Sequence, residues 1–203
     1  MDDGQVSKGE RTRQAIMEAA YDLFLEQGYA ATSMRQIAER AGLALGGIYN
    51  HFLNKDAIFC ELILERHPYR QILPIMLSTP ADDPESFVRS AAQTMVDELG
   101  KRPDFIKLIL IEIVEFNGRN MPKIMESVLP EVLPFIQQFG QQRGLLRDIP
   151  PFIFFRAFLG LFISNYITEL LIGDTPIIQT QNHALDHFVE IFLHGVLADK
   201  EPA

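Results

Sequence analysis

The stretch of sequence that decides the fold runs from residue 32 to residue 55 and reads TSMRQIAERAGLALGGIYNHFLNK. Ser33, with Gln36 three residues later, has the pattern of a capping box, which opens a short helix. Gly42 ends that helix, because glycine adopts the conformation of a tight turn at no steric cost. A second short helix follows, with apolar residues along one face at Leu45, Ile48 and Phe52. Two short helices joined by a turn that contains glycine predict a helix-turn-helix.

The apolar spacing also predicts how these two helices pack. The first helix is expected to pack through Ile37 and Ala38 against the apolar face of the second, which turns the other face of the second helix outward. The outward face would carry Leu45, Gly46, Tyr49 and Asn50. A helix exposed in this way fits the major groove of duplex DNA, which is about 12 Å wide. The alternative is a small helical hairpin whose polar face meets only solvent.

Helical periodicity dominates the rest of the chain, and no stretch shows the sustained alternation of a strand. We therefore predict an all-α fold of about nine helices. A first helix that ends at Gly28 precedes the motif, and Pro130 and Pro134 are expected to bend or split one of the later helices. The helices expected after the motif cover residues 56–67, 84–99, 104–116, 122–143, 151–172 and 182–198.

The pattern of the sequence changes at Pro68, and we therefore divide the chain into two domains at this point. Residues 1–55 form a three-helix domain that contains the helix-turn-helix, residues 56–67 form a linking helix, and residues 68–203 form a larger helical domain. Residues 152–172 are apolar nearly all round, so this helix needs two partners. Either it is the central core helix of its own domain, or one of its faces pairs with a second subunit, which its length favours.

Composition excludes several classes of protein. The net charge of −9 argues mildly against a nucleic-acid partner. Cys60 is the only cysteine, and we expect it to be a buried small hydrophobe rather than a redox sensor. No apolar run reaches the length of about 20 residues that a membrane-spanning helix needs, and the first four residues are acidic. These features predict a cytoplasmic protein.

No nucleophile–base pair, metal-ligand spacing or glycine-rich phosphate loop is present, so we predict neither an enzyme nor a cofactor.

The motif resembles the DNA-binding segment of the tetracycline-repressor (TetR) family of bacterial transcriptional regulators. The matching residues are Ser33, Ile37-Ala38, Ala41-Gly42, Tyr49, His51-Phe52 and Lys55. The resemblance is close over about residues 11–60. Beyond residue 66 it rests only on an all-α pattern of suitable length.

The resemblance implies a ligand-responsive, homodimeric DNA-binding regulator, more specifically a repressor that an effector releases from a palindromic operator. The residues expected to contact phosphates are Thr32, Ser33, Arg35, Tyr49, His51 and Lys55, with Arg11 and Arg13 as further candidates. The residues expected to contact bases are Leu45, Gly46 and Asn50. Ala44 is a poor helix cap and Leu45 offers a base only an apolar contact, so we expect few direct base contacts and a larger part for DNA shape.

The charge of the motif is more favourable to DNA than the charge of the chain. Its cations Arg35, Arg40 and Lys55 stand against one carboxylate, Glu39, which is a local balance of +2. With two or three cations per subunit at phosphates, binding by a dimer is expected to depend on salt with a log–log slope of about −4 to −5.

For the second domain, the resemblance implies a dimer interface formed by the last two helices and an effector cavity among the helices before them. The interface residues expected are Phe154, Phe158, Leu161, Phe188 and Phe192. The cavity residues expected are Glu112, Phe116, Phe162, Asn165 and Tyr166, and the abundance of phenylalanine favours a small apolar or aromatic effector. The last helix also carries a stripe of His183, His187 and His194, which either meets solvent or the rim of a partner, as we favour, or binds zinc.

One alternative function stays open at this point. A chain with Ala44, Leu45 and Gly47 at the start of the second motif helix is also compatible with a helical small-molecule carrier that has lost specific DNA binding.

Overall fold

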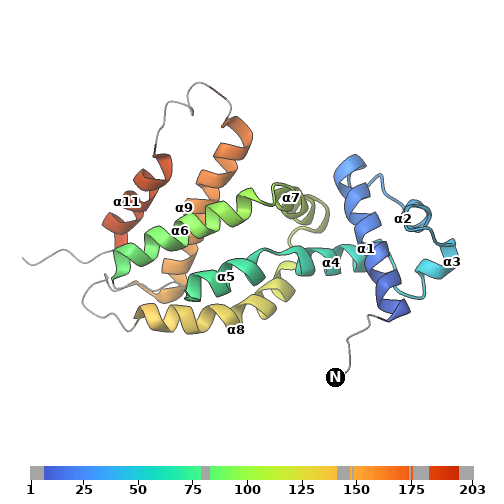
Figure 1. Cartoon of the computed structure of the whole chain (residues 1–203), viewed down its shortest axis with the longest axis horizontal. Helices are drawn as coiled ribbons and strands as arrows, with labels where there is room; N and C mark the ends of the chain where they lie inside the picture. The colour runs from blue at the N-terminus through green and yellow to red at the C-terminus, as the bar shows by residue number, and fades with distance from the viewer. Residues whose placement is uncertain are drawn as a thin grey trace, which may run out of the picture. The chain divides into compact units, whose positions relative to one another are not determined.

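The structure, a computed structural model, describes residues 7–78, 83–140, 147, 149–173, 175 and 183–196. Over these residues it is all α-helical, with ten helices and no strand, which confirms the predicted fold class. The chain divides into two compact units, one made of residues up to His67 together with Asp104–Ile124, and one made of Pro68–Pro103 together with residues from Met125 onward (Figure 1). The first four residues, and residues 141–143, 182, 197 and 198 of two predicted helices, lie outside the described ranges.

The first unit begins with α1 (Lys8–Gln27), α2 (Met34–Arg40), α3 (Leu45–Ile48) and α4 (Lys55–Arg66). The predicted capping box is confirmed, since Ser33 Oγ accepts a hydrogen bond from the backbone N–H of Gln36 and the Gln36 side chain accepts one from the N–H of Ser33. Gly28 ends α1 with a positive φ of 86°, and Asn54 Oδ1 caps α4 by accepting from the N–H of Ala57 at 2.8 Å. The boundaries of these helices therefore follow from local side-chain chemistry.

An aromatic cluster forms the core of the first unit and includes a helix from much later in the chain, α7 (Asp104–Phe116). Phe116 of α7 stacks on Phe59 of α4 with ring centroids 4.7 Å apart and lies 4.8 Å from the ring of Tyr29. Phe24 of α1 completes the cluster. We had expected a second domain continuous from residue 68, and these contacts instead group residues 104–124 with the first helices.

The turn between α7 and α8 (Met121–Gly140) is held by a fully buried carboxyl group. Asn117 and Gly118 both have positive φ and reverse the chain, as the sequence predicts. Glu112 is 0% exposed, and its two carboxyl oxygens accept from the backbone N–H of Asn120 at 2.7 Å and from Asn120 Nδ2 at 2.8 Å. Because every buried polar group here has a partner, the carboxyl group stabilises the turn.

The second unit contains α5 (Tyr69–Ser78), α6 (Pro84–Gly100), most of α8, α9 (Pro151–Ile172) and α11 (Ala184–Val196). The sequence did not predict α5, because Pro74 lies inside it and proline normally ends a helix. The structure has α8 as one element in spite of Pro130 and Pro134, so the expected split does not occur. Asp83 caps α6 and Pro84 occupies its first turn, as predicted.

The buried face of α9 packs on α6 and α11 within the second unit. The ring of Phe192 on α11 lies 5.1 Å from that of Phe154 and 5.6 Å from that of Phe158. All three phenylalanines are buried in the single chain, so the prediction that they form a dimer interface is wrong. Leu161 and Phe188, the other two predicted interface residues, are half-buried. An all-round apolar helix offers two faces, and periodicity alone does not say which one turns inward.

The opposite face of α9 is exposed and largely apolar. Phe152–Ile172 is long and apolar enough to cross a membrane by length and composition, which our sequence analysis did not anticipate. Arg156 and Glu169 interrupt this segment, and its Phe154–Phe158–Phe162 face lies in a protein core. These two observations favour an apolar helix that is partly covered by protein.

Candidate nucleic-acid interface

The residues predicted to form the reading face lie on α3, which ends at Ile48, and on the turn that follows it. Ile48 and Phe52 are buried, as are Ile37 and Ala38 of α2, which confirms the predicted packing. Tyr49 is 51% exposed and Leu45 is 44% exposed, and Gly46 and Asn50 are also exposed. The Tyr49 hydroxyl and the Asn50 amide make no hydrogen bond with any residue that the structure describes, so both are available to an outside partner.

The start of α3 has two features that the packing of the unit does not require. Ala44 sits at the N-cap position and makes no side-chain hydrogen bond, as expected. Gly46 and Gly47 follow, and a Cβ atom on either one would meet no other atom within 4 Å. Each glycine costs about 1 kcal/mol of helix propensity relative to alanine. What these glycines provide is a bare backbone that an outside partner can approach closely.

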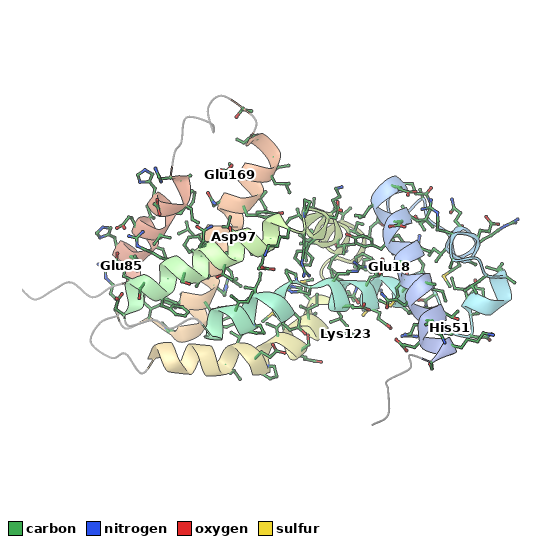
Figure 2. The ribbon with its side chains drawn as sticks, viewed as in Figure 1. Glu18, His51, Glu85, Asp97, Lys123 and Glu169 are labelled. Carbon is green, nitrogen blue, oxygen red and sulfur yellow. The ribbon has the colours of Figure 1, made fainter. Side chains whose placement is uncertain are left out.

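Arg13 of α1 holds the end of α3 in place. Its Nη1 donates to the backbone oxygen of His51 at 3.0 Å, and its Nε donates to Glu61 Oε1 of α4 at 2.7 Å. The guanidinium also lies 4.2 Å from the ring centroid of Phe52. Arg13 is thus occupied inside the unit, and the prediction that it contacts phosphate is wrong. The His51 ring, which lies beside the first turns of α1, is half-exposed and has no hydrogen bond among the described residues (Figure 2).

Lys55 and Thr32 are occupied by backbone groups of the turn between α1 and α2. Lys55 Nζ donates to the carbonyl oxygens of Tyr29 and Thr32, both at 2.6 Å, and burial lowers the pKa of its ammonium group. One of its three N–H donors is left over. The Thr32 hydroxyl is buried and donates to the carbonyl oxygen of Gly28 at 2.8 Å, so the prediction that it binds phosphate is wrong.

A polar network joins this turn to the one between α7 and α8. The Tyr29 hydroxyl donates to Asp56 Oδ1, and burial together with this hydrogen bond raises the pKa of Tyr29. The other Asp56 oxygen pairs with Arg119 Nη2 at 3.0 Å. Lys55 lies over the Tyr29 ring, so α1, α4 and the α7–α8 turn are held together around the motif.

The cations on the surface of the motif are paired with carboxylates. Arg35 pairs with Glu39 at 2.9 Å, and Arg40 pairs with Glu26 of α1 at 2.8 Å. Each pair is neutral as a unit, so the local balance of +2 counted from the sequence does not describe free cations. Ser33 is exposed, but its hydroxyl and its backbone N–H both serve the capping box.

Two cations of α1 are not paired with any described carboxylate, and sequence reasoning named Arg11 but missed Lys8. Lys8 and Arg11 on the first turn of α1 are exposed and have no ion pair with any described residue. Their spacing of three residues on one helix was the available signal, because residues three apart lie on the same side of a helix.

The predicted cavity residues lie in both units. Glu112 and Phe116 belong to α7, where Asn120 and the aromatic cluster account for their contacts, so neither supports an effector pocket. On α9, Phe162 is fully buried and the Tyr166 hydroxyl donates to the backbone oxygen of Leu99 at 2.9 Å. Asn165 is 5% exposed and makes no hydrogen bond with any described residue.

An apolar pocket of about 10 Å³ between α8 and α9 is lined by Met125, Val128, Leu129, Val132, Phe152 and Phe155. A cavity of this volume has room for about one water molecule, so it is not itself an effector site.

Two further expectations concern metal binding and the cysteine. No three His, Cys, Asp or Glu side chains lie close enough to hold a metal ion in the described part of the chain. Within the histidine stripe, His183 pairs with Asp186 at 3.2 Å and His194 with Glu190 at 3.8 Å. Cys60 is half-exposed, with Lys123 Nζ at 3.4 Å from its Sγ, so the prediction that it is fully buried is wrong.

Comparison with known proteins gives the family of this arrangement. The family model of bacterial regulatory proteins of the tetR family matches residues 16–62, which run from α1 into α4. Residues 16–62 are therefore a DNA-binding domain of the tetR type. Across 55 residues the chain is 42% identical to the HTH-type transcriptional regulator AcrR of Shigella flexneri, a match that covers 27% of this chain and 26% of AcrR.

Likeness to TetR proteins extends over the whole chain at lower identity. An uncharacterized HTH-type transcriptional regulator of Bacillus subtilis, YvkB, is 24% identical over 193 residues, which cover 93% of this chain and 98% of YvkB. The structure of NalD, the secondary repressor of the MexAB-OprM multidrug efflux pump in Pseudomonas aeruginosa, matches with a TM-score of 0.61 at 27% identity. That match covers 94% of this chain and 98% of NalD. These relatives are transcriptional regulators and not enzymes.

Proposed function

We propose that this protein is a homodimeric TetR-family repressor that binds a palindromic operator through α3 and leaves it when a small apolar or aromatic effector binds the second unit. The observation that carries the proposal is the surface of α3, where Tyr49, Asn50 and His51 present polar groups that the protein itself does not use. Groups of this kind on an exposed helix of a helix-turn-helix are those that contact duplex DNA.

The contacts divide between phosphates and bases. Tyr49, His51 and the remaining donor of Lys55 hold phosphates, and the exposed Ser33 and Arg35 lie beside them at the start of α2. Asn50 reads a base edge, since an amide pairs with adenine in the major groove. Leu45 offers an apolar contact to a thymine methyl group, and Gly46 lets the backbone approach the base pairs.

The dimer interface lies on the exposed face of α9. This face carries a stripe one helix side wide, formed by Ile153, Ala157, Gly160, Ser164 and Leu171, and Ile191 on α11 is also exposed. Small side chains in the middle of an apolar stripe allow two helices to pack closely, and burial of the stripe removes apolar surface from water. Two reading helices in one dimer then meet two half-sites about 34–36 Å apart or a multiple of that.

The effector is a neutral molecule with one hydrogen-bonding group. Asn165 is buried on α9 without a hydrogen bond, next to Phe162 and Tyr166, and an unpaired buried amide costs about 1–3 kcal/mol. A ligand with a carbonyl or hydroxyl group beside an apolar body recovers that energy. The charged candidate among the predicted cavity residues, Glu112, already has both oxygens bonded to Asn120, so it does not favour a cationic ligand.

The proposal is tested by selecting duplexes from a random-sequence pool with the purified dimer and measuring mobility shifts on the enriched sequence. We expect a palindromic sequence to be enriched, and Tyr49→Phe to bind it about three- to tenfold more weakly, because each subunit loses one hydrogen bond to phosphate. Tyr21→Phe on α1 is the matched control and is expected to bind like the wild type. If no sequence is enriched, the proposal is contradicted. That result would favour the small-molecule carrier, an alternative that is compatible with the absence of a side-chain cap at Ala44.

A further inference from the structure

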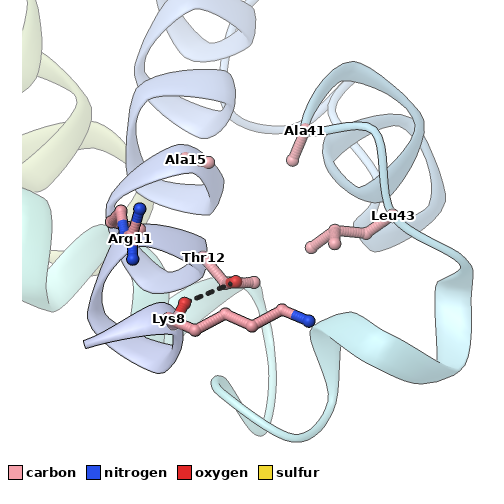
Figure 3. Close-up of a pocket in the computed structure, with 6 residues that line it drawn as sticks. All are labelled: Lys8, Arg11, Thr12, Ala15, Ala41 and Leu43. Carbon is pink, nitrogen blue, oxygen red and sulfur yellow. Dashed lines mark hydrogen bonds between the residues drawn. The ribbon is translucent and has the colours of Figure 1, made fainter.

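A groove on the first unit lies between the N-terminal half of α1 and the turn between α2 and α3. It has a volume of about 410 Å³ and is lined by Lys8, Arg11, Thr12, Ala15, Ala41 and Leu43 (Figure 3). Leu43 lies two residues before the first residue of α3. The groove therefore borders the helix that carries the reading face, and the function proposed so far does not use it.

Within residues 7–67, the groove is where the cations without a partner lie. Residues 7–67 contain seven lysines and arginines. Five of them have partners within the unit, namely Arg13 with Glu61, Arg35 with Glu39, Arg40 with Glu26, Arg66 with Glu18, and Lys55 with two carbonyl oxygens. The two that remain, Lys8 and Arg11, have no partner among the described residues, and both line the groove.

The rest of the lining leaves these two charges uncompensated. The floor is formed by Ala15, Ala41 and Leu43, which offer no side-chain acceptor. The Thr12 hydroxyl donates to the backbone oxygen of Lys8 at 2.9 Å. In Figure 3 the Lys8 side chain extends across the groove below Leu43, whereas Arg11 lies on the other side of α1. Two cations that point to different sides suit two separate anionic groups better than one.

We propose that Lys8 and Arg11 are the main electrostatic anchors of this protein on the DNA backbone, with Lys8 holding a phosphate beside α3 and Arg11 holding a second phosphate on the other side of α1. This inference rests on the proposed DNA binding. It moves the main charge contribution from Arg35, which is paired with Glu39, to the first turn of α1, and Lys55 keeps the one phosphate contact of its remaining donor. A phosphate attracts an unpaired cation more strongly than a cation that is already neutralised by a carboxylate, because the pair has no net charge to offer at a distance.

The reassignment sets the salt dependence of binding. Two cations per subunit neutralise four phosphates per dimer, which contributes about −3.6 to the log–log slope of affinity against salt. Each of Lys8→Ala and Arg11→Ala removes two contacts per dimer and is expected to make the slope shallower by about 1.8. At 0.1 M salt each variant then binds roughly 60-fold more weakly than the wild type, with the difference vanishing toward 1 M.

The experiment measures the affinity of the full-length dimer for the selected duplex between about 0.05 and 0.4 M salt. The variants are Lys8→Ala, Arg11→Ala, the double variant, and Lys107→Ala of α7 as a control with the same loss of charge in the same unit, since Lys107 pairs with Asp104 away from the motif. We expect the double variant to lose about 3.6 of the slope and Lys107→Ala to keep the wild-type slope. Because Lys8 and Arg11 make no side-chain contacts that the unit needs, thermal melting of both variants is expected to be unchanged.

Two outcomes would overturn the inference, and they can be told apart. If the double variant keeps the wild-type slope, or if Lys107→Ala loses as much slope as Lys8→Ala, the phosphates are held elsewhere and the proposed DNA binding still stands. If the wild-type protein retains no duplex at low salt, the DNA-binding proposal and this inference fail together.

Discussion

Replacing Gly160 by arginine is expected to turn the dimer into monomers and to abolish retention of the selected duplex at nanomolar protein. Gly160 is exposed in the middle of the apolar stripe of α9, and a Cβ atom there would meet no other atom of the chain within 4 Å. The single subunit therefore tolerates the change, and its helix gains about 1 kcal/mol from the loss of a glycine. The charge is tolerated only in water, because burying an unpaired guanidinium in an apolar interface costs several kcal/mol.

The loss of DNA binding follows from the loss of the second reading helix. Linking two binding heads in one particle raises avidity on the order of 10²–10⁴-fold, and a monomer forfeits that gain. Light scattering gives the mass, and mobility shift gives the duplex binding. Gly100→Arg is the matched control, since Gly100 is exposed at the end of α6, lies outside the stripe and has equally free space. A Gly160→Arg protein that stays dimeric would show that the subunits meet through another surface.

Glu112→Leu is expected to lower the free energy of unfolding by roughly 2–4 kcal/mol. The leucine has nearly the volume of the glutamate but leaves the backbone N–H and the side-chain amide of Asn120 buried without acceptors. The turn from α7 to α8 then loses the group that holds it, although Phe116, one turn further along α7, keeps its aromatic partners. Urea unfolding at neutral pH, followed by circular dichroism, measures the difference.

Replacing Asn165 by leucine is expected to have the opposite effect on stability from Glu112→Leu. Asn165 is as deeply buried but has no hydrogen bond to lose, so Asn165→Leu is expected to raise the free energy of unfolding by about 1–2 kcal/mol. Equal losses at both positions would mean that Asn165 has a polar partner in the protein. That result would remove the argument for a hydrogen-bonding effector at this point of α9.

The sequence predicted the elements whose causes are local. The capping box at Ser33, the positive φ at Gly28 and the cap at Asn54 depend on residues within one turn of the helix end, and all three are present. Pro74 misled the prediction because the helix α5 contains it, although proline removes a backbone donor. Helix ends can thus be predicted from residues close to them in the sequence, except where tertiary packing overrides the local preference.

The candidate site was harder to predict, because it depends on which side chains meet across long separations. Arg13 and Glu61 are 48 residues apart, and Arg40 and Glu26 are 14 apart, so a count of charges along the motif did not reveal that these cations are paired. The Phe116–Phe59 stack, which draws α7 into the first unit, is equally remote in sequence. The interface face of α9 was misplaced for a related reason, since the sequence is apolar all round and the burial of Phe154 and Phe158 depends on Phe192 of α11.

The central claim is that two copies of α3 sit on one duplex in a two-fold particle. Hydroxyl-radical footprinting of the selected duplex with the wild-type protein tests it most directly, because the radical reports contacts to every sugar along both strands. We predict two protected patches, related by the palindrome and centred about 10 base pairs or a multiple of that apart on one face of the helix. A single patch without a symmetric mate, or no protection at protein concentrations that shift the duplex, would contradict the account.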